Sequence, residues 1–146
     1  MDAGRRQLQD CRVRGAWKEI LVLFDQVREI LSELLDVEVV EITPESFLVR
    51  DLGMESIDFL ELAVALNQRF KVPVHDDTLF LRNLRLCVLQ AREGGQAVLE
   101  RLKDNFGFLS EERLEQILTA LDAGPVIQVR DLVSYIRWQM KNTAAA

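Results

Sequence analysis

The chain has 146 residues, of which 49% are hydrophobic and 29% charged, a composition typical of one compact soluble domain with enough apolar material for a core. Its net charge of −6 argues against general nucleic-acid binding, because such binding depends on basic residues that neutralise phosphates. No apolar stretch approaches the roughly 20 residues that span a bilayer, and the first residues lack the apolar run of a signal peptide. We therefore expect a monomeric, cytoplasmic protein without a membrane span.

The residues that most often bind metals give no metal-site pattern in this sequence. Cys11 and Cys87 lie too far apart for a metal-ligand spacing or a redox pair, so we expect buried or incidental thiols. The only histidine, His75, is followed by Asp76 and Asp77, but three adjacent residues lack the i, i+4 spacing of ligands on a helix. A helix cap provided by an aspartate is the expected role of this cluster.

The N-terminal part of the chain divides into a basic segment and a long helix. Residues 1–19 hold five Arg or Lys against few acids, which predicts a solvated, frayed extension; contact with an acidic face or a partner is the alternative. Between Trp17 and Val37 the apolar residues recur at helical spacing, which predicts a first helix, through Ile20, Leu21, Phe24, Val27, Ile30, Leu31, Leu34 and Leu35.

An irregular connection follows this helix. Residues 37–42 alternate too briefly to predict sheet, so we expect an extended segment. Thr43, Pro44 and Glu45 supply a cap, a proline at the first helical position and an acid in the first turn, which predicts a short helical turn before Phe47.

A second helix is predicted after Gly53, because Ser56 is a hydroxyl residue directly before an apolar run of helical period. One face is expected to pack, and its members are Ile57, Leu60, Val64 and Phe70, with Phe59, Leu62, Ala63 and Leu66 beside them. The opposite face is acidic. Pro73 ends the helix shortly after Phe70, because the residue before a proline resists helical geometry. Taken alone, Ser56 reads as an ordinary helix cap.

Residues 51–62 resemble the attachment site of the acyl carrier protein family, whose Asp-Ser-Leu signature opens the second helix and carries 4'-phosphopantetheine on the serine. Here the triplet is Glu55, Ser56 and Ile57. The resemblance implies that Ser56 is the covalent attachment point and that a phosphopantetheinyl transferase is a partner. Residues 67–69 lack the acids that the family often has there, which changes the partner surface.

The resemblance also implies partner enzymes that load and transfer acyl groups. A phosphodiester on Ser56 would lie at the free N–H groups and positive dipole end of a helix, which suits an anion. The carboxylates of Asp51, Glu55, Asp58 and Glu61 would form the partner-binding face, because such charges steer enzymes that carry basic patches. Phe47 resembles the buried phenylalanine that anchors the loop between the family's first two helices.

The remaining chain is predicted to be helical. A short third helix begins near Thr78, and residues 96–106 and 110–121 read as two further helices, with Ser110 as a cap and residues 123–125 as a stop. Because the family usually has a short link at this point, residues 82–125 look like an inserted group of helices. Residues 126–140 resemble the family's last helix, and residues 141–146 read as a frayed tail.

The predicted fold is therefore all-α, an acyl-carrier-like helical bundle formed by residues 20–81 and 126–140 with additional inserted helices. The predicted function is a carrier of acyl groups on phosphopantetheine. Peptidyl and D-alanyl carriers remain alternatives, as does a helical adaptor that carries nothing. An enzyme is disfavoured, because no nucleophile elbow surrounds Ser56 and no glycine-rich phosphate loop is present. The insertion would enlarge or cover a cargo cavity, offer a docking face, or only extend the core.

Overall fold

The computed structural model describes residues 3–121 and 126–145. Within these residues all regular elements are helical, and the one β-type pairing is a single bridge between Phe47 and Gln128. The all-α prediction is confirmed. In chain order the elements are α1 (Ala3–Leu35), the 3₁₀ turn η1 (Val39–Glu41), α2 (Ser56–Phe70), α3 (Asp76–Leu79), α4 (Leu84–Glu93), α5 (Val98–Asn105), α6 (Glu111–Thr119) and α7 (Val129–Ala145).

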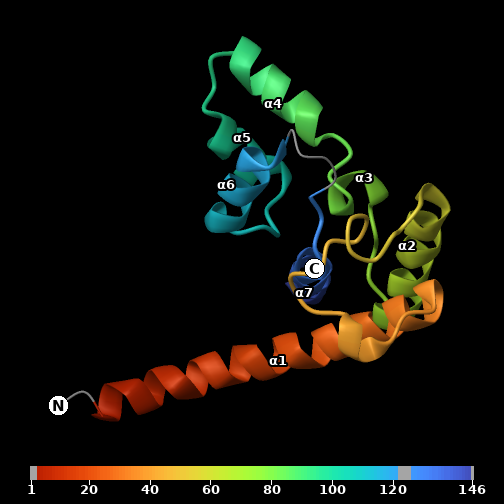
Figure 1. Cartoon of the computed structure of the whole chain (residues 1–146). Coiled ribbons are helices and arrows are strands. Elements are labelled where there is room, and N and C mark those ends of the chain that lie inside the picture. The colour runs from red at the N-terminus through yellow and green to blue at the C-terminus, as the bar shows by residue number, and fades with distance from the viewer. Residues whose placement is uncertain (1–2, 122–125, 146) are drawn as a thin grey trace.

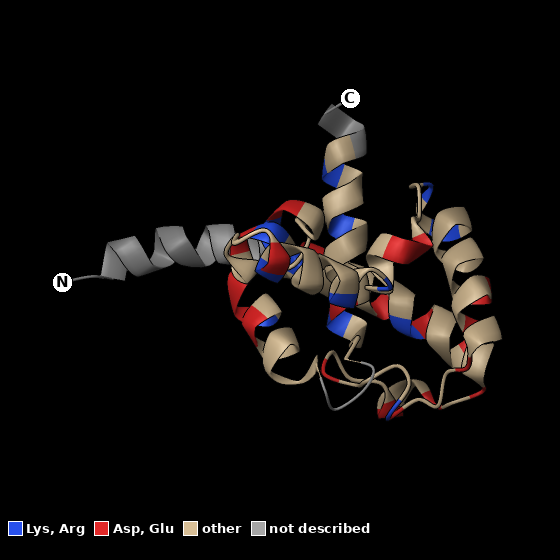
Figure 2. Ribbon diagram, turned by 90° about the horizontal axis from the view of Figure 1, so that it is seen from above, with Lys and Arg blue, Asp and Glu red and all other residues tan. Residues whose placement is uncertain are grey.

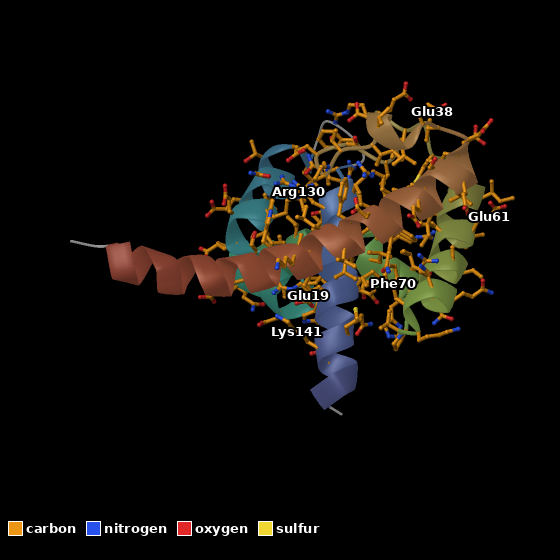
Figure 3. The ribbon with its side chains drawn as sticks, turned by 90° about the horizontal axis from the view of Figure 1, so that it is seen from below. Glu19, Glu38, Glu61, Phe70, Arg130 and Lys141 are labelled. Carbon is orange, nitrogen blue, oxygen red and sulfur yellow. The ribbon has the colours of Figure 1, made fainter. Side chains whose placement is uncertain are left out.

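The C-terminal helix α7 lies between two groups of helices (Figure 1). On one side is α2, and on the other are α4, α5 and α6, the helices of the predicted insertion. The long helix α1 crosses α7, and the crossing is seen from below in Figure 3, where Glu19 of α1 and Lys141 of α7 are labelled near it. The insertion therefore packs against the same helix that supports α1.

One continuous hydrophobic core joins the two groups of helices. Its fully buried members come from α1, α2 and α7, and also from α5 and α6: they include Val27, Leu31, Leu62, Leu66, Leu102, Leu114, Ile117, Leu132, Tyr135 and Ile136. Burial of a side chain of this size contributes about 1.5–3 kcal/mol relative to exposure. Helices α5 and α6 therefore share one hydrophobic core with α1, α2 and α7 and do not form a separate unit.

Both end helices are longer than the sequence predicted. The first helix begins at Ala3 and not at Trp17, so its backbone includes most of the predicted extension; the side chains there lie outside the described part. The last helix continues to Ala145 and not only to Met140, so the predicted frayed tail is helical as far as the structure describes it. No proline interrupts either segment, and alanine, lysine and arginine have high helix propensity.

The loop between α1 and α2 differs in detail from the prediction. The helical turn expected at Thr43 is a single hydrogen-bonded turn, in which the Ser46 N–H donates to the Thr43 carbonyl at 3.1 Å. Phe47, the predicted buried anchor, is half-buried beneath the Arg50 guanidinium, 4.5 Å from its ring centre. The fully buried residue is its neighbour Leu48, which anchors the loop instead.

The short helix α3 is held against α7 by a buried tyrosine. Tyr135 is fully buried, and its hydroxyl accepts hydrogen bonds from the backbone N–H of His75 and the side chain of Gln139, both at 2.9 Å. His75 occupies the cap position of α3, so the prediction of an aspartate cap was wrong. Asp76 and Asp77 lie in the first turn, where negative charge favours the helix dipole.

Two boundaries of helices α4 to α6 have local causes, and the cap at Ser110 was predicted. The Ser110 hydroxyl caps α6 by accepting a hydrogen bond from the Arg113 N–H at 3.2 Å. Gly95 follows α4 with a φ of +71°, a conformation that favours glycine. The stop predicted at residues 123–125 lies outside the described residues.

A buried ion pair joins the insertion to the start of α7. Arg113 of α6 donates two hydrogen bonds to the Asp131 carboxylate, at 2.9 and 2.8 Å, and a third at 2.6 Å to the Val126 carbonyl. Asp131 also accepts from the Gln128 N–H at 2.9 Å. The side chains of Arg113 and Asp131 are only 9% and 3% exposed, so this contact fixes where the insertion meets the bundle.

Candidate functional site

Ser56 is the first residue of α2 and is exposed to solvent. The cap position belongs to Glu55, whose N–H donates to the Asp58 carboxylate at 2.8 Å. The reading of Ser56 as an ordinary helix cap is therefore wrong. The Ser56 hydroxyl makes no hydrogen bond to any residue that the structure describes, which leaves it accessible for chemistry.

The loop before Ser56 is tied to the start of α7. Leu48 N–H donates to the Ile127 carbonyl and Val129 N–H donates to the Ser46 carbonyl, both at 3.0 Å. Within the loop the Asp51 carboxylate accepts from the Phe47 N–H at 2.8 Å. These bonds hold the loop that leads into α2.

A glycine makes the last bend before this helix. Gly53 has a φ of +70°, which costs other residues conformational energy and explains a glycine here. Its N–H donates to the Val49 carbonyl at 3.0 Å, and the buried Met54 N–H donates to the Leu48 carbonyl at 3.0 Å. These hydrogen bonds fix the backbone of the bend, so the start of α2 has a defined position.

The four acidic residues of the predicted partner face have different surroundings. Asp51 and Asp58 each hold a backbone N–H, as described above, so they stabilise the loop and the helix start. Glu55 is exposed, and its side chain accepts the Asp58 N–H in a reciprocal capping box. Glu61 is exposed, and Figure 3 shows it pointing away from the bundle. Figure 2 shows charges of both signs on both sides of α7, so the net negative charge is not gathered in one region.

An apolar strip on α2 was missed by the sequence analysis. Ile57, Leu60 and Val64 are 60%, 54% and 57% exposed, although they were predicted to pack. The buried face of α2 is formed by Leu62, Ala63 and Leu66. Apolar residues occur on both sides of this helix, so periodicity alone could not tell which side packs. The exposed strip begins beside Ser56 and lies next to Glu61.

A cavity of about 500 Å³ opens beside Ser56. Its wall is mostly apolar and comes from α2, the α3–α4 turn, α4 and the segments on either side of residues 122–125, through Val49, Ser56, Phe59, Phe80, Leu81, Arg82, Leu84, Arg85, Leu121, Val126 and Ile127. Phe59 and Phe80 form part of it in an edge-to-face pair with ring centres 4.8 Å apart. Much of this wall belongs to the predicted insertion, which brings it next to the predicted attachment serine.

Two arginines at the start of the insertion line the same cavity. Arg82 and Arg85 are both exposed, and Arg85 donates a hydrogen bond to the Leu121 carbonyl at 3.2 Å. The sequence analysis gave them no role. The signal that could have found them is their i, i+3 spacing at the start of a helix that holds no acid in its first turn.

The cavity wall contains a strained residue. Leu81 has a φ of +55°, a left-handed conformation that costs an L-residue with a large side chain roughly 1–2 kcal/mol. Glycine is usual at such a position after a helix. Leu81 occupies this position despite the strained backbone. Its side chain is only 8% exposed and belongs to the hydrophobic core beside the cavity.

Metal-binding clusters and membrane-spanning helices are absent from the part of the chain that the structure describes. It contains no group of three His, Cys, Asp or Glu side chains able to hold a metal ion, and none of its helices has the length and apolar content to cross a membrane. Cys87 is a free, buried thiol, while the side chain of Cys11 lies outside the described part.

Comparison with known proteins points to one family. The family model described as the phosphopantetheine attachment site matches residues 25–85, from within α1 to the start of α4. An acyl carrier protein of Helicobacter pylori is 39% identical over 57 residues, which is 39% of this chain and 73% of the relative. Acyl carrier proteins of Sulfurovum sp. and Wolinella succinogenes are 40% and 37% identical over 57 residues, covering 76% and 75% of those proteins.

The described residues fit the prosthetic group that this family carries. Phosphopantetheine is joined through a phosphodiester to a serine hydroxyl, and Ser56 offers an exposed hydroxyl at the positive end of a 15-residue helix. The matched segment is therefore a phosphopantetheine attachment site and the cofactor is covalent 4'-phosphopantetheine. The inserted helices beyond residue 85 and the last helix lie outside the matched segment. From its attachment segment and its relatives, this chain belongs to the acyl carrier protein family.

Proposed function

We propose that the chain carries an acyl group as a thioester on phosphopantetheine attached to Ser56, and delivers it to partner enzymes of fatty-acid, polyketide or specialised lipid synthesis. The observation that carries this proposal is the position of Ser56, exposed at the first residue of α2 and inside the matched segment. The attached group supplies a terminal thiol that forms the thioester. The protein supplies no catalytic residue and acts as a substrate of its partners.

The protein's own contribution at Ser56 is to accommodate an anion. The N–H groups of Ser56 and Ile57 have no partner within the helix and lie at its positive dipole end, whereas the Asp58 N–H donates to the Glu55 carbonyl at 3.0 Å. Asp58 accepts the Glu55 N–H at 2.8 Å with its carboxylate and keeps its negative charge, so it repels a neighbouring phosphate as the exposed acids do. The remaining exposed acids repel it by only about 1 kcal/mol at ~4 Å in water.

Partners would bind the exposed strip of Ile57, Leu60 and Val64 together with Glu55 and Glu61. Apolar side chains at the centre of an interface contribute most of the binding energy, while charges at its rim steer approach. The contacts would therefore weaken as salt rises. The partners are a phosphopantetheinyl transferase and the enzymes that load and transfer the acyl group.

An acyl cargo is favoured over a peptidyl or D-alanyl cargo by the apolar cavity beside Ser56. Burying about eight methylenes would stabilise a bound chain by roughly 6 kcal/mol before any cost of opening the bundle. The exposed acids near Ser56 also favour the acyl type, since the peptidyl motif usually has a non-acidic residue before its serine. Residues 20–81 and 126–140 form the carrier bundle, and the protein acts as a monomer in the cytoplasm.

The proposal is tested by intact-mass measurement before and after incubation with coenzyme A and a promiscuous phosphopantetheinyl transferase. A gain of one phosphopantetheine is expected for the natural chain and none for Ser56→Ala. Ser110→Ala is the matched control, because Ser110 is also exposed at a helix start, and it should keep the gain. If no transferase modifies a folded sample, the helical adaptor becomes the better reading.

A further inference from the structure

We infer that Arg82 and Arg85 of the insertion bind the phosphate of the prosthetic group and so direct the arm from Ser56 toward the inserted helices. The inference rests on the proposed attachment at Ser56. It assigns to the insertion a role in positioning the group.

Ser56, Arg82 and Arg85 line one cavity of about 500 Å³. A phosphate joined to the Ser56 hydroxyl would stand at the edge of this cavity, which the two long arginine side chains also line. Guanidinium groups match phosphate oxygens with paired hydrogen bonds, which a lysine ammonium cannot do.

The contacts of the two arginines within the described residues leave their charges available for an anion. Arg85 uses one guanidinium nitrogen on the Leu121 carbonyl, which holds it at the cavity and leaves further donors available. Arg82 forms no ion pair with any residue in the described ranges 3–121 and 126–145. Neither charge is therefore committed to a carboxylate within that part of the chain.

Acidic and basic side chains lie on different elements around Ser56. On the α2 side stand the carboxylates of Glu55, Asp58 and Glu61, and on the insertion side stand the two guanidinium groups. A phosphodiester at the positive end of α2 is repelled by these carboxylates and attracted to the two guanidinium groups. The arm would therefore leave Ser56 over the cavity and away from the exposed strip of α2.

The experiment compares the melting temperatures of unmodified and phosphopantetheinylated protein at low and high salt. In the natural chain attachment should raise the melting temperature by about 2–4 °C at low salt, and the rise should shrink at high salt. The double variant Arg82→Gln/Arg85→Gln should lose this rise. Arg92→Gln is the matched control, because Arg92 is exposed on α4 but does not line the cavity, and it should keep the rise.

A second measurement covers the case in which the double variant folds poorly. In the natural chain the side-chain Nε–H resonances of Arg82 and Arg85 should shift on attachment, while that of Arg92 should not. If attachment raised the melting temperature equally in all variants, or did not shift these two resonances, the inference would be overturned. The carrier function would remain intact. Absence of any mass gain on Ser56 would overturn both.

Discussion

Replacing Arg113 with methionine should destabilise the protein more than any exposed charge change. The substitution leaves Asp131 buried with a single remaining hydrogen bond, from the Gln128 N–H, and leaves the Val126 carbonyl without its donor. Breaking a buried pair in this way costs about 3–5 kcal/mol, a large part of a total stability of about 5–15 kcal/mol. For a domain of this size the melting temperature should fall by roughly 10–15 °C.

The assay is thermal and urea unfolding of the unmodified protein followed by circular dichroism. The double variant Arg113→Met/Asp131→Leu should recover most of the loss, because it removes both charges together. If Arg113→Met lowered the free energy of unfolding by less than about 1 kcal/mol, the reasoning would be refuted, because the buried pair would then be no stronger than an ion pair at the surface.

A matched control lies in the same part of the chain. The exposed ion pair of Lys103 and Glu111 has a 2.9 Å contact, and Lys103→Met should leave the melting temperature almost unchanged. The hydrogen bond to Glu111 raises the pKa of Lys103 above its ordinary 10.5. Any contribution of this pair is therefore fully present at neutral pH and is lost only as the pH rises through the raised pKa.

Three further predictions concern the site and its supports. Gly53→Ala should lower the free energy of unfolding in urea by about 1–2 kcal/mol because of the positive φ alone, since the added Cβ meets no atom within 4 Å. The control Gly107→Ala should change stability little. Leu60→Glu should leave the melting temperature within about 2 °C but lower kcat/KM of the transferase roughly tenfold, and an unchanged rate would exclude the strip from the interface. Tyr135→Phe should cost about 1–3 kcal/mol in the same unfolding assay, because the His75 N–H loses its acceptor; a loss below 0.5 kcal/mol would contradict this.

The parts of the fold that the sequence predicts correctly depend on local signals. The second helix from Ser56 to Phe70 is bounded by a glycine turn and by Pro73, and both act within a few residues. The cap at Ser110 is equally local. A pattern confined to one segment needs no knowledge of its tertiary neighbours.

The features that the sequence did not predict depend on contacts between distant segments. Leu60 and Leu62 are chemically identical, and only the packing of α2 against the bundle exposes one and buries the other. Ser56 and Glu55 compete for the cap position, and the Asp58 carboxylate decides in favour of Glu55 through one hydrogen bond. The residues that form the wall of the cavity beside Ser56 could not be identified from the sequence, because they come from positions as distant as 49 and 127.

The buried pair at the junction also bears on how the insertion and the attachment site are related. An apolar contact of the same area would hold α6 against α7 with less directional specificity, whereas the paired hydrogen bonds from Arg113 to Asp131 fit one arrangement best. The third bond, to the Val126 carbonyl, fixes the segment whose next residue lines the cavity and accepts the Leu48 N–H. One polar cluster therefore sets the position of the insertion, of the cavity wall and of the loop that leads to Ser56.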